Sequence, residues 1–116
     1  MSQITIYHNP KCATSRNALA MIKEASIEPQ VVEYLKTPLN RESLAALVEE
    51  MQVEVRDILR TKGGLYKELG LDDQSLSDDA LLDAIAQHPV LMERPIVVSA
   101  KGVKLCRPYA LVEALL

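Results

Sequence analysis

Three side chains that could carry out thiol chemistry, His8, Cys12 and Ser15, stand together in the segment HNPKCATS near the start of the chain. A cysteine thiolate is a strong nucleophile, and its pKa falls at a helix N-terminus or beside basic groups. Lys11 and Arg16 supply positive charge on either side of Cys12. This combination predicts that Cys12 is a catalytic nucleophile.

The positions of His8 and Ser15 relative to Cys12 suggest supporting roles. A protonated His8 would lower the pKa of the thiol, whereas a neutral one would only hydrogen-bond within the turn. Ser15 stands where a C-x-x-C enzyme has its second cysteine, and it either assists Cys12 or caps the following helix. Because a serine cannot form a disulfide, a two-cysteine redox cycle within this loop is excluded.

The second cysteine, Cys106, stands 94 positions after Cys12 and ends an apolar segment. Such a thiol is usually buried in the core, and the alternative is that Cys106 forms a disulfide with Cys12. A structural disulfide is not expected, because a chain of this composition does not need one and the cytoplasm, the expected location of a chain with no signal-peptide pattern, keeps such thiols reduced. A metal site is not expected either, because the cysteines, His8 and His88 show no paired ligand spacing.

Three arginines indicate a candidate anion site only when they are considered together. Arg94 and Arg107 each precede a proline, which favours an extended backbone, and Arg60 lies in the middle of the chain. Singly, each is typical of a solvated surface charge. Gathered around Cys12, the three would offer the forked donors that suit a phosphate-like anion.

Length and composition indicate one domain, spanning residues 1–116, with a packed core. The chain is 48% hydrophobic and has no Phe or Trp, and its formal charge is −3. An acidic chain without aromatic stacking platforms is a poor partner for nucleic acid or an anionic membrane, and neither is expected. No apolar run approaches the roughly 20 residues of a membrane span, and the first is too short for a signal peptide.

The spacing of apolar residues predicts that the segment with Cys12 joins a strand to a helix. Residues 3–7 alternate in polarity, helical spacing follows over about 12–25, and residues 31–35 form a short segment that opens with two β-branched valines. A parallel β-α-β unit with this order places Cys12 at the carboxyl end of the sheet. There the free N-H groups of the helix start would stabilise a thiolate and bind an oxyanion.

The rest of the chain completes a recognisable order of elements. Helical patterns fill about 40–90, segments 95–98 and 103–106 form a hairpin pattern, and Pro108 opens a terminal helix. This order predicts an α/β, thioredoxin-like (glutaredoxin-like) fold, with a four-stranded mixed sheet and a helical insertion between its halves. Arg94-Pro95 stands where such folds carry a cis-proline opposite the active thiol.

Seven stretches of the chain carry a resemblance to one enzyme family. They are ITIYHNPKCATSRN at 4–17, YLKTP at 34–38, VRDILR at 55–60, YKELGL at 66–71, HP at 88–89, RPIVV at 94–98 and LCRP at 105–108. Over nearly its whole length the chain resembles the arsenate reductases of the glutathione- and glutaredoxin-coupled type.

The resemblance implies an oxidoreductase that reduces arsenate to arsenite and acts in arsenical resistance. In that family the cysteine attacks arsenate, three arginines hold the oxyanion, and a histidine and a serine lie beside the thiol. The corresponding residues here are Cys12 as nucleophile, His8 and Ser15 beside it, and Arg60, Arg94 and Arg107 as substrate ligands. The implied partners are arsenate, glutathione as co-substrate and glutaredoxin, with no bound cofactor.

Two other functions use the same fold and the same cysteine loop. One is a redox-sensing regulator in which Cys12 reacts with oxidants and the helical insertion contacts a partner protein. The other is a general glutathione-dependent thiol reductase. The complete arginine set favours the arsenate reductase, because neither alternative needs it. Lys11 stands where some family members have a small residue and is expected to affect only anion affinity.

Overall fold

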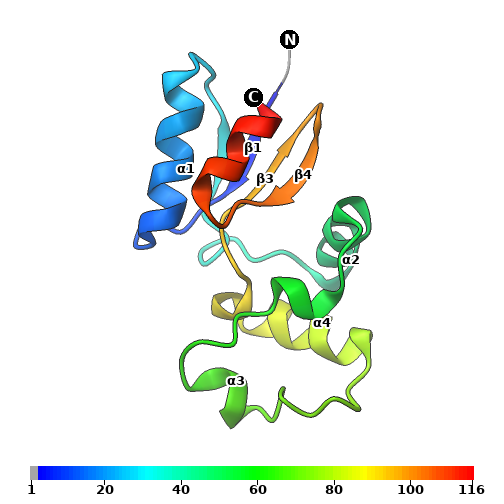
Figure 1. Cartoon of the computed structure of the whole chain (residues 1–116). Helices are drawn as coiled ribbons and strands as arrows, with labels where there is room; N and C mark the ends of the chain where they lie inside the picture. The colour runs from blue at the N-terminus through cyan, green and yellow to red at the C-terminus, as the bar shows by residue number, and fades with distance from the viewer. Residues whose placement is uncertain (1–2) are drawn as a thin grey trace. The chain divides into compact units, whose positions relative to one another are not determined.

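The computed structural model describes residues 3–116, which divide into two compact units. The sheet unit comprises the chain up to Thr37 together with Arg94–Leu116, and the helical unit comprises Pro38–Glu93. Figure 1 shows strands only in the sheet unit, where the first and last parts of the chain lie together. The helical unit is therefore inserted between the two segments that form the sheet.

A four-stranded mixed sheet confirms the predicted α/β fold. Its order is β2-β1-β3-β4, with β1 parallel to β2 and the other neighbours antiparallel. Ile6 is the central residue of this pairing, opposite Val31 on one side and Val97 on the other. The strands are β1 (Thr5–Tyr7), β2 (Gln30–Val32), β3 (Ile96–Ser99) and β4 (Gly102–Leu105).

The core of the sheet unit lies between the strands and two helices. Helix α1 (Ala13–Glu24) contributes Ala18 and Ile22, which are one helical turn apart and fully buried. The C-terminal 3-10 helix η3 (Tyr109–Leu115), red in Figure 1, contributes Val112 and Leu115. Both helices pack against Ile4 and Ile6 of the strand segment, so the start of α1 is fixed relative to the sheet.

Two elements of the sheet unit differ from the sequence prediction. The second strand ends at Val32 rather than at residue 35, because the carbonyl of Glu33 accepts hydrogen bonds from the N-H groups of Lys36 and Thr37 and turns the chain. The terminal helix is a 3-10 helix. Its buried residues Val112 and Leu115 are three apart, which is the repeat of a 3-10 helix.

The helical unit is built on two capped helices, α2 (Arg41–Met51) and α4 (Asp78–Gln87). The side chains of Asn40 and Ser77 accept hydrogen bonds from the first turns of these helices, as N-caps do. Both helices bury their apolar faces. The remaining elements are η1 (Val55–Ile58), α3 (Leu65–Glu68) and η2 (Pro89–Leu91).

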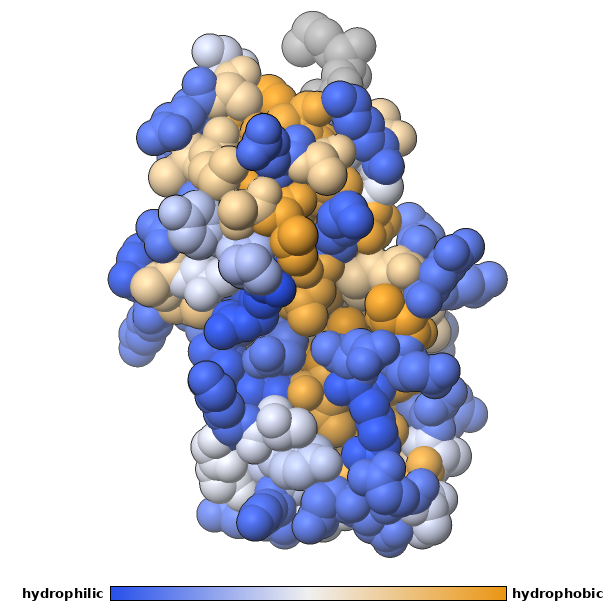
Figure 2. Space-filling model, in the orientation of Figure 1, coloured by the Kyte–Doolittle hydropathy of each residue, from blue (hydrophilic) through white to orange (hydrophobic). Residues whose placement is uncertain are grey.

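Charge is distributed unequally between the two units. The sheet unit has eight Lys and Arg residues against four Asp and Glu, whereas the helical unit has five against twelve. Their formal charges are therefore +4 and −7. Figure 2 shows one face of the molecule, and hydrophilic side chains cover much of the helical unit there. A basic sheet unit suits an anionic ligand better than the overall charge of the chain suggests.

Candidate functional site

Cys12 occupies the position expected from the sequence, at the N-cap of α1. Its backbone is extended, its N-H donates to the carbonyl of Asn9 at 3.0 Å, and its carbonyl accepts from the N-H of Arg16 at 2.9 Å. The thiol is free and partly exposed. The first N-H groups of α1 therefore lie next to a sulfur that a substrate can reach.

The surroundings of Cys12 favour its thiolate. Burial alone would raise the pKa of the thiol, but hydrogen bonds from the Ser15 N-H and from the side chains of Arg94 and Arg107 outweigh it and lower the pKa from 9.0 to about 7. A large fraction of Cys12 is therefore ionised at neutral pH. Helix-start amides and arginines, rather than a single basic neighbour, produce this effect.

Arg94 and Arg107 come together because they flank the ends of a hairpin. Ile96 and Leu105 are paired across strands β3 and β4, so the residues just outside them are neighbours. Arg107 donates from Nη1 to the Arg94 carbonyl at 2.9 Å, and the same nitrogen lies 3.8 Å from the Cys12 sulfur. The peptide bonds to Pro95 and Pro108 that follow these arginines are both cis.

The guanidinium group of Arg94 is poised to bind an anion. Its Nε and Nη1 atoms are buried, and neither has a hydrogen-bond partner among residues 3–116. Buried donors without a partner carry a large desolvation cost, which an oxyanion accepting hydrogen bonds from both would remove. The geometry therefore points to an anionic ligand beside Cys12.

His8 and Ser15 form a buried pair directly behind the cysteine loop. The Nδ1 atom of His8 lies 2.6 Å from the Ser15 Oγ atom, which also accepts a hydrogen bond from the Asn9 N-H at 3.1 Å. Ser15 is fully buried, and His8 is only 6% exposed. Ser15 thus ties the end of strand β1 to the first turn of α1.

The surroundings of His8 favour its neutral form, whereas it is the protonated form that would lower the pKa of the Cys12 thiol. Burial lowers the pKa of His8 below 6.5; Arg16 and Lys23 act in the same direction, and Glu33 opposes them. The imidazole is therefore mostly neutral at pH 7. In this structure His8 acts on the loop through its hydrogen bond to Ser15.

Asn9 is a structural residue of the loop that the sequence analysis did not single out. Its side-chain oxygen accepts a hydrogen bond from the Lys11 N-H at 3.0 Å, its carbonyl accepts one from Cys12, and it is 5% exposed. An Asn side chain that bonds to the backbone two residues on is a common turn motif. The Asn9-Pro10 pair was the sequence signal that could have identified this role.

Cys106 lies in the hydrophobic core of the sheet unit, and its exposed fraction is zero. Burial raises the pKa of its thiol to about 11, although the charge of Lys104 opposes the shift. Its sulfur donates weakly to the Lys104 carbonyl at 3.7 Å. A neutral, inaccessible thiol of this kind is a poor nucleophile.

Arg60 belongs to the helical unit, where it is held by the segment before Arg94. Its Nη1 atom forms a 3.2 Å ion pair with Glu93, and its backbone N-H donates to the carbonyl of Leu91. The family resemblance pointed to Arg60 but not to Glu93. No pattern in the sequence pairs two residues that are 33 positions apart.

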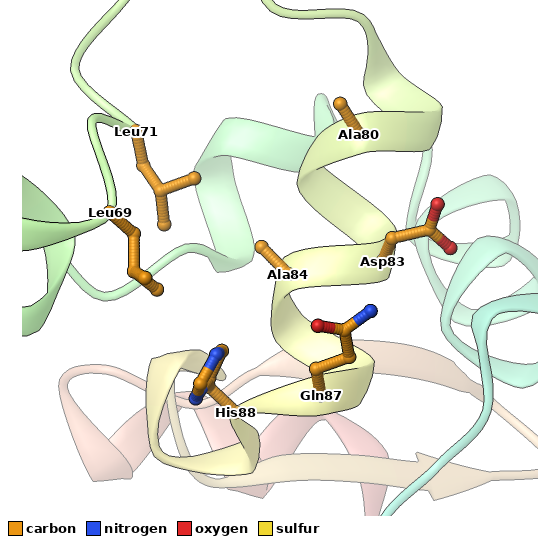
Figure 3. A pocket seen from close by; sticks show the side chains of 7 residues that line it. All are labelled: Leu69, Leu71, Ala80, Asp83, Ala84, Gln87 and His88. Carbon is orange, nitrogen blue, oxygen red and sulfur yellow. The ribbon is translucent and has the colours of Figure 1, made fainter.

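The helical unit also contains a pocket of about 360 Å³, shown in Figure 3. None of the predicted site residues lines it. Its walls are Leu69, Leu71, Ala80, Asp83, Ala84, Gln87 and His88.

The part of the chain that the structure describes contains neither a metal-ligand cluster nor a membrane-spanning helix. Within residues 3–116, no group of three His, Cys, Asp or Glu side chains is placed to hold a metal ion. In the same range no helix has the length and apolar character needed to cross a bilayer.

Comparison with known proteins relates this geometry to one family. The model of the ArsC family matches residues 7–115. The chain is 54% identical over 109 residues to the arsenate reductase of Rhizobium meliloti (strain 1021), covering 94% of this chain and 78% of that protein. It is 52% identical over 112 residues to an arsenate reductase of Escherichia coli, and the match covers 97% of this chain and 79% of that protein.

A solved structure agrees with the sequence comparison. The arsenate reductase from Vibrio cholerae superposes with a TM-score of 0.95 at 47% identity, covering 98% of each chain. The fold of this chain, including its helical insertion, is therefore the fold of that protein.

Proposed function

Since the chain belongs to the ArsC family, we propose that it is an enzyme that reduces arsenate to arsenite, with Cys12 as its nucleophile. The observation that carries this function is the pairing of a low-pKa thiol with an unsatisfied arginine. The pKa of Cys12 is about 7, and beside it Arg94 has two buried N-H-bearing atoms without partners. A sensor cysteine needs the first feature but not the second.

The first step is nucleophilic substitution at arsenic. The Cys12 thiolate forms a sulfur-arsenic bond, and one arsenic-oxygen bond breaks as that oxygen takes up protons and leaves as water. Arsenic remains pentavalent in this step. The buried donors of Arg94 and the guanidinium of Arg107 stabilise the negative oxygens that remain on the adduct.

The reduction itself requires two electrons, which we assign to two external thiols. Glutathione condenses on the adduct with loss of a second water, and a glutaredoxin cysteine then attacks the glutathione sulfur. Glutathione and glutaredoxin end as a mixed disulfide, and the electron pair of the broken bond between glutathione sulfur and arsenic reduces arsenic to the trivalent state. Water then hydrolyses the remaining bond between Cys12 and arsenic, which releases arsenite and regenerates the Cys12 thiol. External thiols are needed because Ser15 cannot resolve Cys12 and Cys106 is buried in the core.

Arg60 completes the proposed oxyanion site. It carries the third guanidinium of the set that the family resemblance assigns to the substrate, and its own unit holds it through Glu93. Three forked donors suit an arsenate dianion better than one, because each forms charge-assisted hydrogen bonds. His8 and Ser15 support the loop that carries the nucleophile.

We also propose that the enzyme works in the cytoplasm without a bound cofactor. Both cysteines are free thiols, and the proposed reductants, glutathione and glutaredoxin, belong to a reducing compartment. Glutathione enters as co-substrate rather than as a resident group.

A coupled assay tests this function. Arsenate, glutathione and glutaredoxin are supplied with glutathione reductase, NADPH oxidation is followed, and arsenite is measured directly. We expect NADPH oxidation that depends on arsenate and matches the arsenite formed. Turnover of a small disulfide without any arsenate reduction would instead identify a general thiol reductase, and the absence of both activities would favour a redox-sensing regulator.

A further inference from the structure

The ion pair between Arg60 and Glu93 is built into a short antiparallel pairing of the helical unit. Leu59 and Met92 face each other across an isolated bridge, and hydrogen bonds on both sides of it join Arg60 to Leu91 and Glu93 to Ile58. In this register Arg60 and Glu93 are diagonal neighbours on the same face. Diagonal neighbours are within reach when both side chains are long.

The backbone around the pair is fixed by burial as well as by hydrogen bonds. Leu59 and Met92 are 4% and 1% exposed, so the bridge is part of the core of the helical unit. The Arg60 and Glu93 side chains are 23% and 22% exposed, which leaves them accessible but partly shielded from solvent. The backbone that carries each side chain of the ion pair is therefore held in place.

Within the helical unit, Glu93 is hydrogen-bonded to one side of the Arg60 guanidinium group. Its Oε1 atom lies 3.2 Å from Nη1, and within the helical unit no hydrogen bond engages Nε or Nη2 of Arg60. An arginine has five N-H donors, and those on Nε and Nη2 form a fork that matches two oxygens of an oxyanion. The contact with Glu93 leaves this fork available.

Resting on the proposed function, we propose that Glu93 is a positioning residue: it holds the Nη1 side of Arg60 so that the Nε and Nη2 fork is preorganised for the substrate oxyanion. An unrestrained arginine loses rotamer freedom when it binds a ligand, and this loss weakens binding. Glu93 imposes that order before the substrate arrives. On Arg60 its carboxylate engages Nη1 and leaves Nε and Nη2 to the oxyanion, so at this guanidinium it assists binding rather than competing with it.

Substitutions of Glu93 test the proposal through the KM for arsenate and through competitive inhibition by inorganic phosphate, an unreactive oxyanion of the same shape. Glu93→Ala should raise the KM for arsenate and the inhibition constant for phosphate about tenfold each, which is the effect of losing one hydrogen bond. The kcat should change much less. Glu93→Gln keeps an oxygen acceptor for Nη1 and should stay within about threefold of the parent. Asp83→Ala, which breaks the exposed Arg41 ion pair of the same unit, is the matched control and should change neither constant.

A double substitution separates this role from a structural one. In an Arg60→Ala background, adding Glu93→Ala should have no further effect on either constant, whereas a structural contribution of Glu93 would persist there. Urea unfolding of each variant shows whether it is folded. Unchanged or tighter oxyanion binding in Glu93→Ala, a Glu93→Gln variant as weak as Glu93→Ala, or a persisting effect in the double variant would overturn the proposal.

The same series distinguishes failure of this proposal from failure of the proposed function. If Arg60→Ala itself binds arsenate and phosphate like the parent, Arg60 is not an oxyanion ligand, and both the arginine set and the role of Glu93 are wrong. If Arg60→Ala weakens binding but Glu93→Ala does not, only the positioning role is wrong.

Discussion

The Nη1 atom of Arg107 lies 3.8 Å from the sulfur of Cys12 and 2.9 Å from the carbonyl oxygen of Arg94. One side chain therefore connects the nucleophile on the cysteine loop with the hairpin that carries the second arginine. The hydrogen bond to Arg94 fixes the direction of the guanidinium, and the guanidinium in turn stabilises the thiolate. The acidity of Cys12 and the proposed anion site therefore both involve Arg107.

Substitution of Arg107 should therefore make Cys12 less acidic. In Arg107→Ala we expect the pKa of Cys12 to rise from about 7 toward 9.0, because one of its hydrogen-bond donors is lost. Thiolate absorbance against pH measures this shift. Lys36→Ala, which removes an exposed charge paired with Glu33, is the control and should leave the titration unchanged. An unchanged midpoint in Arg107→Ala would show that the helix-start amides and Arg94 suffice to lower the pKa of Cys12.

The stability of the protein should depend on pH through Cys12. Its folded-state pKa of about 7 is below the ordinary 9.0, so its contribution to stability is fully present above pH 9.0 and is lost as the pH falls through 7. The parent should therefore gain stability relative to Cys12→Ser as the pH rises through this window. Urea unfolding of both proteins at several pH values measures the difference, and parallel curves would contradict the prediction.

Arg94→Ala should weaken arsenate binding without unfolding the protein. Its buried donors are proposed to bond the oxyanion, and a lost hydrogen bond to a charged group is worth about 1.5 to 3 kcal/mol, or roughly a tenfold to hundredfold rise in KM. Steady-state kinetics with arsenate as the varied substrate gives this value. Parent-like kinetics in Arg94→Ala would remove the main physical argument for the anion site.

Ser15→Ala should destabilise the cysteine loop. The substitution leaves the buried Asn9 N-H and His8 Nδ1 without the oxygen they bond, and an unsatisfied buried group costs about 1 to 3 kcal/mol. Urea unfolding should show this loss of stability. Ser43→Ala is the matched control, because Ser43 is exposed and only its backbone N-H takes part in a cap. Equal stability of the two variants would contradict the structural role of Ser15.

The sequence predicted the parts of the site that depend on local pattern. The strand, turn and helix around Cys12 follow from alternation, an Asn-Pro turn and helical spacing, and the hairpin that brings Arg94 and Arg107 together follows from two β-branched segments around a glycine. The caps at Asn40 and Ser77 were also predictable, because capping depends on residues three positions apart.

Features that depend on three-dimensional packing were not predictable. The lowered pKa of His8 results chiefly from burial, and burial is set by the whole sheet unit. The pairing of Arg60 with Glu93 depends on an isolated bridge between residues far apart in sequence. The sequence pattern did not show that the C-terminal helix is a 3-10 helix or that the second strand ends early, because local hydrogen bonding and packing decide both.

The most direct test of a single catalytic thiol with external reductants is arsenite formation by Cys12→Ser and Cys106→Ser, with arsenate, glutathione and glutaredoxin present. The partly exposed, low-pKa Cys12 should be indispensable, so Cys12→Ser should form no arsenite above background. Cys106 is buried with a pKa of about 11, and Cys106→Ser should keep most of the parental rate once urea unfolding shows that it is folded. A folded Cys106→Ser variant as inactive as Cys12→Ser would contradict the account and indicate a relay between the two cysteines.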